Sequence, residues 1–340
     1  MKKILFIDLE SVPGHLNFNK LFIDYLTNKN SAIDLVCSYD YFNKINHFNS
    51  NKIIYNVDNL NISYSNKLFY RLHILIILLL LKIKISNKKY DEIIFSNFDE
   101  VSLYLSGFYK KCSIVDHGNL ADSELNRIKK YFLKKISNYS TLIVFNKMIL
   151  NKARDFGFKK CFVMNQGLSP KIILKNKISI QNYFNLDSPK YIFFPHFSKF
   201  GDDSELNIFK NILNETFLIK NNLYVIYKSQ NRPDFESSRH IFLDIWIDEN
   251  LYKNLFLSAE AIFLMYPQSF KLRVSALLLE SFSNTKPVFL SKIDSFKHYS
   301  SFFNYDPYVD HNDIGIKLIN FFKNKPKILY KGLSNLKFGK

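Results

Sequence analysis

Short apolar runs alternate with longer amphipathic stretches along almost the whole chain. The runs have the length and composition of strands buried on both faces, and the stretches between them have the period of helices. Strands that alternate with helices build parallel sheets, so the pattern predicts an α/β protein. The predicted strands are Lys3–Leu9, Ile33–Cys37, Ile53–Tyr55, Glu92–Ser96, Cys112–Val115, Thr141–Phe145, Cys161–Asn165, Tyr191–Phe194, Leu223–Tyr227, Ile241–Ile245, Ala261–Tyr266 and Pro287–Leu290.

The alternation stops after Asn165 and starts again near Tyr191. The stretch between them is polar and basic, as expected of a linker. With 340 residues, the chain is long enough for two domains with separate cores. We therefore expect a first domain over residues 1–170, a linker over 171–189, a second domain over 190–325 and a Lys-rich tail over 326–340.

Polar residues mark the starts of several predicted helices. Asp122 is expected to cap one basic amphipathic helix that runs to Ile136, and Asp248 is expected to cap Leu251–Ala259. Further helices are predicted at Asn146–Phe156, Asp203–Asn214 and Asp313–Asn324.

Residues 66–85 form the most apolar segment of the first domain. Its uninterrupted run, Ile74–Leu81, is well short of the roughly 20 residues that a membrane-spanning helix needs. Basic residues flank it, namely Lys67, Arg71, Lys82 and Lys84. The segment fits a helix lying in a membrane interface or a core helix packed on the sheet, and one helix can use a separate face for each.

The net charge of +17 calls for an anionic partner. Residues 1–172 hold 25 Lys and Arg against 14 Asp and Glu, so the first half carries most of the excess. No zinc spacing, helix-turn-helix pattern or RNP-like strand accompanies it, and we expect no specific nucleic-acid recognition. An anionic membrane surface is the partner that the first half favours.

Three widely spaced cysteines, Cys37, Cys112 and Cys161, form no C-x-x-C pair, which argues against a zinc site or a disulfide framework. The apolar run at the start of the sequence stops at Asp8, too early for the core of a signal peptide. We therefore expect a cytoplasmic protein, peripheral on the inner face of the plasma membrane.

The segment Ala261–Leu290 carries the clearest candidate chemistry. It contains a buried strand, a loop with Lys271 and Arg273, a helix that starts near Ser275, and a second strand. Parallel sheets bind ligands at the carboxyl ends of their strands, where helix N-termini point N–H groups at anions. Cations and amides suit a diphosphate, and the carboxylate of Glu280 suits the hydroxyls of a ribose.

This segment resembles the donor-binding region of family 4 glycosyltransferases of the GT-B fold. The resemblance rests on Tyr266-Pro267, Arg273-Val274-Ser275-Ala276, Glu280 and Lys286-Pro287-Val288, in that order. The family has two glutamates in an E-x7-E pattern, of which the second contacts the ribose. Glu280 matches the second, whereas Leu272 stands at the position of the first. Some members carry an Arg-x-Ser-Gly-like sequence instead, to which residues 273–276 are similar.

The resemblance implies two Rossmann-like doubly wound domains facing a cleft, the first for the acceptor and the second for the donor. It implies a retaining, metal-independent transfer of a sugar from a UDP- or GDP-linked donor, with no cofactor besides that substrate. The acceptor is expected to be a lipid-linked glycan or glycolipid in bacterial cell-surface polysaccharide synthesis.

Site residues follow from the same resemblance. Lys199, Lys228, Arg273 and Ser275 are expected at the donor diphosphate, with His117 and Glu280 as the catalytic pair. His117 would contact the sugar or the acceptor, unless it is a hydrogen-bonded structural histidine. Gly14 and His15 follow the first strand in a loop that faces the cleft in GT-B proteins, and a glycine needed only for the turn is the alternative. One glycine is no G-x-G-x-x-G fingerprint, so NAD is not indicated.

Two other classes of function remain open. One is a different GT-B enzyme, an epimerase or an inverting transferase, and an epimerase would need paired acidic residues that the sequence does not reveal. The other is a catalytically degenerate GT-B binding module, which Leu272 at the position of the first glutamate supports.

Overall fold

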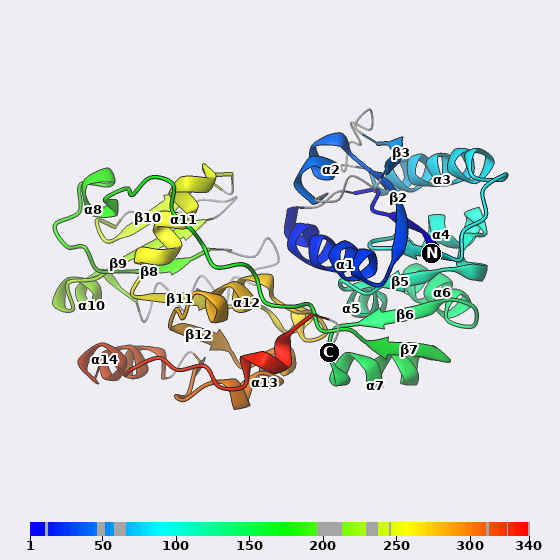
Figure 1. Ribbon diagram of the computed structural model, residues 1–340. Helices are drawn as coiled ribbons and strands as arrows, with labels where there is room; N and C mark the ends of the chain where they lie inside the picture. Colours follow the sequence, from blue (N-terminus) through cyan, green and yellow to red (C-terminus); the bar gives the residue numbers. More distant parts are fainter. Residues whose placement is uncertain are drawn as a thin grey trace. The chain divides into compact units, whose positions relative to one another are not determined.

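The computed structural model describes residues 1–10, 13–45, 52–57, 66–195, 213–228, 237–244, 246–310, 313–324 and 326–338. The chain forms two compact units. The first comprises Met1–Gly167, Leu272–Val274 and Asn335–Lys340, and the second comprises Leu168–Lys271 and Ser275–Ser334. Each unit has one parallel sheet with helices around it, which confirms the predicted α/β class (Figure 1).

In its described residues, the first unit has a seven-stranded sheet in the order β3-β2-β1-β4-β5-β6-β7, with every pair parallel. Its strands are β1 (Lys2–Ile7), β2 (Ser31–Cys37), β3 (Lys52–Asn56), β4 (Glu92–Phe95), β5 (Ser113–Val115), β6 (Thr141–Val144) and β7 (Lys160–Val163). The strand order reverses between β1 and β4. Such a switch point is where doubly wound sheets bind ligands, beyond the carboxyl ends of the strands.

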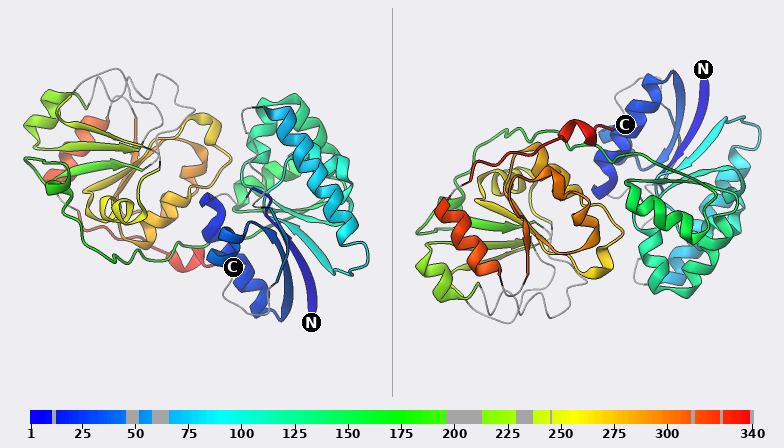
Figure 2. Two further views of the ribbon diagram at one scale, coloured as in Figure 1. Left: turned by 90° about the horizontal axis from the view of Figure 1, so that it is seen from above. Right: turned by 90° about the horizontal axis from the view of Figure 1, so that it is seen from below.

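Helices lie on both faces of this sheet (Figure 2), and alternate residues of its strands point to these opposite faces. Ile4 and Phe6 of β1 pack with α1 and α2, whereas Leu5 and Ile7 belong to the core formed with α3 to α7. The helices are α1 (Leu16–Asn28), α2 (Tyr39–Ile45), α3 (Lys67–Lys84), α4 (Glu100–Ser106), α5 (Asn119–Leu125), α6 (Arg127–Ile136) and α7 (Lys147–Phe156), with the 3-10 turns η1 (Pro13–His15) and η2 (Phe108–Lys111).

The helix α3 is the segment for which two environments were predicted. Ile74, Ile77, Leu78 and Leu81 are buried in the core, which confirms that α3 packs on the sheet. Its other face is exposed and also apolar, so a membrane contact of that face stays a prediction. Of the helices in the described parts of the chain, none is long and apolar enough to cross a membrane.

The single helix predicted from Asp122 to Ile136 is wrong, because α5 ends at Leu125 and α6 begins at Arg127. Asn126 lies between them with an extended backbone, and its side chain accepts hydrogen bonds from the N–H groups of Ile128 and Lys129. An asparagine that caps a helix in this way starts a new helix in place of continuing the old one.

The second unit has, among its described residues, a six-stranded parallel sheet in the order β10-β9-β8-β11-β12-β13. Its strands are β8 (Tyr191–Phe194), β9 (Tyr224–Lys228), β10 (His240–Leu243), β11 (Ala261–Leu264), β12 (Val288–Ser291) and β13 (Tyr308–Val309). The sequence pattern did not predict β13, which is too short to leave a periodic signal. The helix predicted at Asp203–Asn214 lies largely outside the described residues.

Two layers of helices again cover the sheet. Ile192 and Phe194 of β8 pack in a core with α10 and α14, whereas the ring of Phe193 lies 6.1 Å from that of Tyr252 on α11. The helices are α8 (Ile180–Tyr183), α10 (Glu215–Lys220), α11 (Glu249–Ser258), α12 (Ala276–Ser283), α13 (Asp294–Lys297) and α14 (Ile314–Asn324), with the 3-10 turns η3 (Gln268–Phe270), η4 (Ser300–Phe302) and η5 (Leu333–Leu336).

Candidate functional site

Two histidines that the sequence suggested separately lie together in the first unit. His15 ends η1, the turn that follows β1, and His117 lies just beyond the carboxyl end of β5. Their rings stack with centroids 3.7 Å apart and planes 15° apart. The side chains of Phe18 and Phe145 contact His117 from two other directions, at 5.2 Å and 5.1 Å between ring centroids.

This apolar setting keeps both imidazoles neutral. Burial lowers the pKa of His15 to about 4 and lowers the pKa of His117 well below its ordinary value. Within the described part of the chain, Nδ1 of His15 and Nε2 of His117 are buried and have no hydrogen-bond partner. A neutral ring with one unused nitrogen can donate to or accept from a hydroxyl group of a ligand.

Gly14 precedes this pair, and the structure shows no steric need for glycine there. Its φ is not in the left-handed region, and an added Cβ would meet no atom within 4 Å. The explanation that the turn requires a glycine therefore has no support. The expectation that Gly14 and His15 line a ligand site stays a prediction.

Arg273 belongs to the short segment that groups with the first unit. Its guanidinium pairs with the carboxylate of Asp122, which also lies 2.9 Å from Nζ of Lys129. Gly118 gives Arg273 the space it occupies, since its φ is +145° and a Cβ there would come 2.9 Å from Nε of Arg273. The predicted contact of Arg273 with a diphosphate remains a prediction.

In the second unit, Glu280 and Lys228 lie in one cluster although they are far apart in the sequence. Lys228 ends β9, and its Nζ lies 5.1 Å from the ring centre of Tyr252 on α11. The Tyr252 hydroxyl donates a 2.8 Å hydrogen bond to Oε2 of Glu280 on α12. Burial raises the pKa of Glu280 and lowers that of Lys228, and their mutual attraction opposes both shifts.

Tyr252 is the member of this cluster that the sequence analysis missed. It lies within an ordinary helical pattern, and no motif in the sequence marks it. Ser275, predicted at the diphosphate, is buried and caps α12 by accepting a hydrogen bond from the Leu278 N–H. Its hydroxyl also lies 3.4 Å from that of Tyr266. Lys199, the other predicted cation, lies outside the described residues.

Acidic side chains that the sequence analysis did not single out lie near the switch point of the first unit. Glu100 is fully buried, and burial raises its pKa to about 7, while Lys129 and Asn119 partly oppose that shift. Burial also raises the pKa of Glu10, and the negative charge of Asp99 adds to the effect. Across the described ranges, no three His, Cys, Asp or Glu side chains are grouped to hold a metal ion. Metal independence itself stays a prediction.

Comparison with known proteins gives a likeness in structure alone. No protein-family model matches the chain, and no curated protein matches its sequence. HepE from Anabaena, solved in complex with UDP-glucose, is similar in fold with a TM-score of 0.63 at 11% identity, over 96% of this chain and 91% of that one. The chain has the GT-B fold.

Other GT-B structures support the same conclusion. UDP-GlcNAc 2-epimerase from Methanocaldococcus jannaschii, solved with UDP-GlcNAc and UDP, gives a TM-score of 0.60 at 14% identity, over 100% of this chain and 96% of that one. A UDP-forming trehalose-phosphate synthase from Burkholderia xenovorans, solved with glucose-6-phosphate, gives a TM-score of 0.55 at 11% identity, over 77% of this chain and 72% of that one. The predicted GT-B fold is confirmed.

Proposed function

We propose that this protein is a glycosyltransferase that takes a sugar from a UDP-linked donor. The observation that carries the proposal is the cluster of Glu280, Lys228 and Tyr252 in the second unit of a GT-B fold. Such a cluster provides a carboxylate for the ribose hydroxyls and a cation for the diphosphate. UDP is favoured over GDP because the GT-B proteins of similar structure were solved with UDP or UDP-sugars.

The chemistry needs developing negative charge on the diphosphate to be stabilised as the sugar leaves. We assign this role to Lys228, Lys199 and Arg273, together with the N–H groups that follow Ser275, and no metal ion is needed. The neutral His117 is assigned to a hydroxyl of the sugar or the acceptor. Retention of configuration is part of the proposal because the donor segment resembles retaining family 4 enzymes.

The acceptor we propose is a lipid-linked glycan of the cell surface. The outer face of α3 supports it, because this face is apolar and exposed in a chain that otherwise carries a strong basic excess. Its exposed apolar residues are Leu68, Phe69, Leu72, Ile76, Leu79, Leu80 and Ile83. Exposed lysines lie at both ends of the helix, as expected of a surface that meets anionic lipid.

The test is thermal stabilisation by UDP, GDP and CMP, with the wild type, Glu280→Gln and Glu249→Gln side by side. A ligand that binds only the folded state at 100 times its Kd adds about 2.7 kcal/mol to stability. UDP is expected to raise the Tm of the wild type and of Glu249→Gln, whose side chain is exposed on α11. It should have little effect on Glu280→Gln. If no nucleotide stabilises the wild type, the donor site is wrong and a degenerate binding module becomes the better explanation.

A UDP-sugar epimerase is the second candidate. Two observations favour it, namely the similar fold of UDP-GlcNAc 2-epimerase and the acidic side chains of Glu10, Asp99 and Glu100 in the first unit. Proton NMR of UDP-GlcNAc incubated with the protein separates the two functions. An epimerase converts the sugar into its stereoisomer without net release of UDP, whereas a transferase releases UDP when its acceptor is present.

A further inference from the structure

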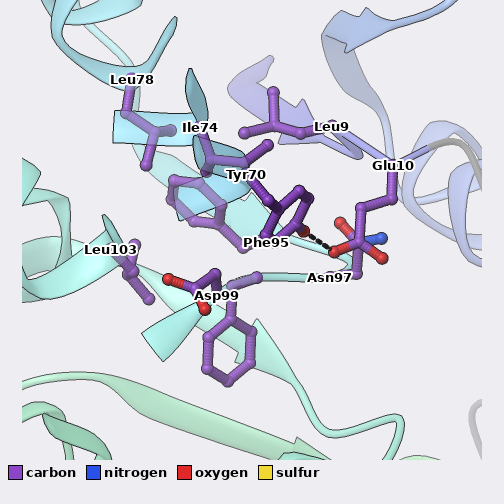
Figure 3. Close-up of a pocket in the computed structure, with 10 residues that line it drawn as sticks. Leu9, Glu10, Tyr70, Ile74, Leu78, Phe95, Asn97, Asp99 and Leu103 are labelled. Carbon is purple, nitrogen blue, oxygen red and sulfur yellow. Dashed lines mark hydrogen bonds between the residues drawn. The ribbon is translucent and has the colours of Figure 1, made fainter. Parts of the chain in front are cut away.

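The first unit has a small cavity between α3 and the carboxyl ends of β1 and β4 (Figure 3). The space in it that a water molecule can occupy is about 10 Å³, which is room for about one water. Its lining includes Glu10, which accepts a hydrogen bond from Tyr70, and the buried amide of Asn97, which has no hydrogen-bond partner in the described residues. One water molecule is enough to satisfy that amide, so the cavity is no candidate for an organic ligand.

The second unit has an exposed side chain that the donor cluster of Glu280, Lys228 and Tyr252 does not use. Trp246 is the only tryptophan of the 340-residue chain, and its side chain is 81% exposed. Tryptophan side chains are on average highly buried. A single exposed apolar residue by itself indicates nothing, so the position of Trp246 has to decide whether it is a binding residue.

Trp246 follows the strand that pairs with the strand of Lys228. Leu243, the last residue of β10, is in register with Lys228, the last residue of β9, and the two strands are parallel (Figure 1). Trp246 comes three residues after Leu243, a distance that a chain covers in at most about 11 Å. It therefore lies near Lys228 at the carboxyl edge of the sheet, where sheets of this kind bind their ligands.

The other end of the same loop is attached to the donor cluster as well. Asp248 caps α11 by accepting hydrogen bonds of 2.8 Å and 3.0 Å from the N–H groups of Asn250 and Leu251. Tyr252, which contacts both Lys228 and Glu280, lies in the beginning of this helix. Only residues 244–247 separate β10 from the cap, so the loop that carries Trp246 is short and is held at both ends.

The parts of a nucleotide define what an indole at this edge can bind. In the proposed function, Lys228 is assigned to the diphosphate and Glu280 to the ribose, which leaves the base without a partner. A base is a flat aromatic ring, and proteins bind such rings by stacking them on aromatic side chains. Trp246 provides the largest aromatic face that a protein side chain can offer.

We propose that Trp246 is the platform on which the base of the donor nucleotide stacks, an inference that rests on the proposed use of a UDP-linked donor. Every base has a π-face, so stacking contributes to affinity and leaves the choice of base to other groups. Trp246 is thus a further binding residue of the donor site, outside the segment Ala261–Leu290.

The first experiment uses the fluorescence of the full-length protein. Because Trp246 is the only tryptophan, its emission reports on this one position when excitation is confined to wavelengths that tyrosine does not absorb. UDP is expected to change the emission in a saturable way as the base covers the indole. Ribose 5-phosphate, which has no base, is the control ligand and should leave the emission unchanged.

The second experiment is a calorimetric titration with UDP of the wild type, Trp246→Phe and Trp246→Leu. Trp246→Leu should weaken UDP binding about 5- to 150-fold, the usual effect of removing an aromatic ring that stacks on a base. Trp246→Phe keeps a smaller π-face and should lose less. The matched control is Tyr183→Leu, at a tyrosine of the same unit that is 56% exposed, and it should bind UDP like the wild type. All variants should keep the wild-type Tm, because the exposed side chains contribute little to stability.

Three results would overturn the proposal: emission that UDP leaves unchanged, equal UDP affinity of the wild type and Trp246→Leu, or equal losses for Trp246→Phe and Trp246→Leu. In each of these cases, UDP binding by the wild type still supports the donor site, and only the role of Trp246 is refuted. If the wild type binds no UDP at all, the proposed function and the role of Trp246 are refuted together.

Discussion

The pKa values of buried titratable side chains in the first unit shift in opposite directions, depending on which protonation state carries the charge. Burial favours the neutral form of each, so it raises the pKa of Glu100 to about 7 and lowers that of His15 to about 4. Between pH 4.5 and 6.5 the two groups change the stability in opposite directions as the pH rises: the shift of Glu100 lowers it and the shift of His15 raises it. Folded Glu100 holds a proton that the unfolded chain has lost, whereas folded His15 lacks a proton that the unfolded chain has bound.

Glu100→Gln should separate these effects. The pKa of Glu100 is raised from 4.5, so its contribution to stability is full below about pH 4.5 and is lost as the pH rises through about 7. The difference in pKa corresponds to roughly 3 kcal/mol. We expect the free energy of unfolding of Glu100→Gln to exceed that of the wild type at pH 8 and to match it near pH 4.5. Urea unfolding at several pH values checks this, and equal pH slopes for the two proteins would contradict it.

A second prediction at this scale concerns Tyr252. Its hydroxyl orients the carboxylate of Glu280, so Tyr252→Phe should weaken UDP binding by about tenfold through loss of that hydrogen bond. Calorimetric titration with UDP measures the effect. Tyr183→Phe, at an exposed tyrosine of the same unit, is the control and should bind like the wild type. Unchanged affinity of Tyr252→Phe would mean that Glu280 needs no such support.

At the scale of elements, α3 is apolar on two faces. The inner face packs on the sheet, while the outer face exposes leucine and isoleucine side chains. A helix that is needed only for packing has a polar outer face. Packing of α3 on the sheet therefore does not explain its apolar outer face, and contact with lipid is the explanation that we propose.

Ile83→Ser should weaken binding to anionic vesicles while leaving the fold intact, because Ile83 is 72% exposed at the basic end of α3. Ile173→Ser is the matched control, since Ile173 is 79% exposed and belongs to the second unit. Co-sedimentation with phosphatidylglycerol vesicles, at low and high salt, measures the difference. Equal binding of both variants and the wild type would remove α3 from the membrane contact.

The strands other than β13 could be predicted from the sequence because each of them has an apolar run with clear borders. Helix boundaries depended on single polar residues, and here the prediction was less successful. Asp248 is the predicted cap of α11, and Asn146, the predicted first residue of a helix, caps α7. The break at Asn126 was missed because the helical pattern continues across it. A side chain that accepts hydrogen bonds from the next turn can end one helix and start another. The spacing of apolar residues along the sequence does not show where this happens.

At the scale of the whole molecule, the two sheets followed from an alternation of strands and helices that restarts near Tyr191, whereas the GT-B fold was predicted from the resemblance of the segment Ala261–Leu290 to family 4 glycosyltransferases. The candidate site was only partly accessible to the same reasoning. His117 follows the end of a recognisable strand, and Glu280 matches the second glutamate of the family motif, so the sequence suggested both. Tyr252 matters through its contact with Glu280, which is distant in sequence, and only the fold reveals that contact.

The first unit also depends on residues far along the chain. The ring of Phe338 lies 5.6 Å from that of Phe18 and 5.8 Å from that of Phe22, between ring centroids. Phe338→Ala should therefore lower the Tm measurably, by an amount equivalent to about 1–3 kcal/mol for a partly buried aromatic side chain. Phe69→Ala, at a phenylalanine that is 67% exposed, should change the Tm little. Similar effects of both changes would contradict the packing role of Phe338.

This late contact bears on how the protein is made. A ribosome synthesises all of the second unit before Phe338 emerges, and domains begin to fold as soon as they are released. Until then, the nascent first unit lacks the ring that packs on Phe18 and Phe22 and keeps an apolar patch that chaperones can recognise. A fragment cut after Gly167 would keep that patch permanently. A circularly permuted chain with residues 335–340 placed ahead of residue 1 would supply this ring to the first unit before the second unit is translated.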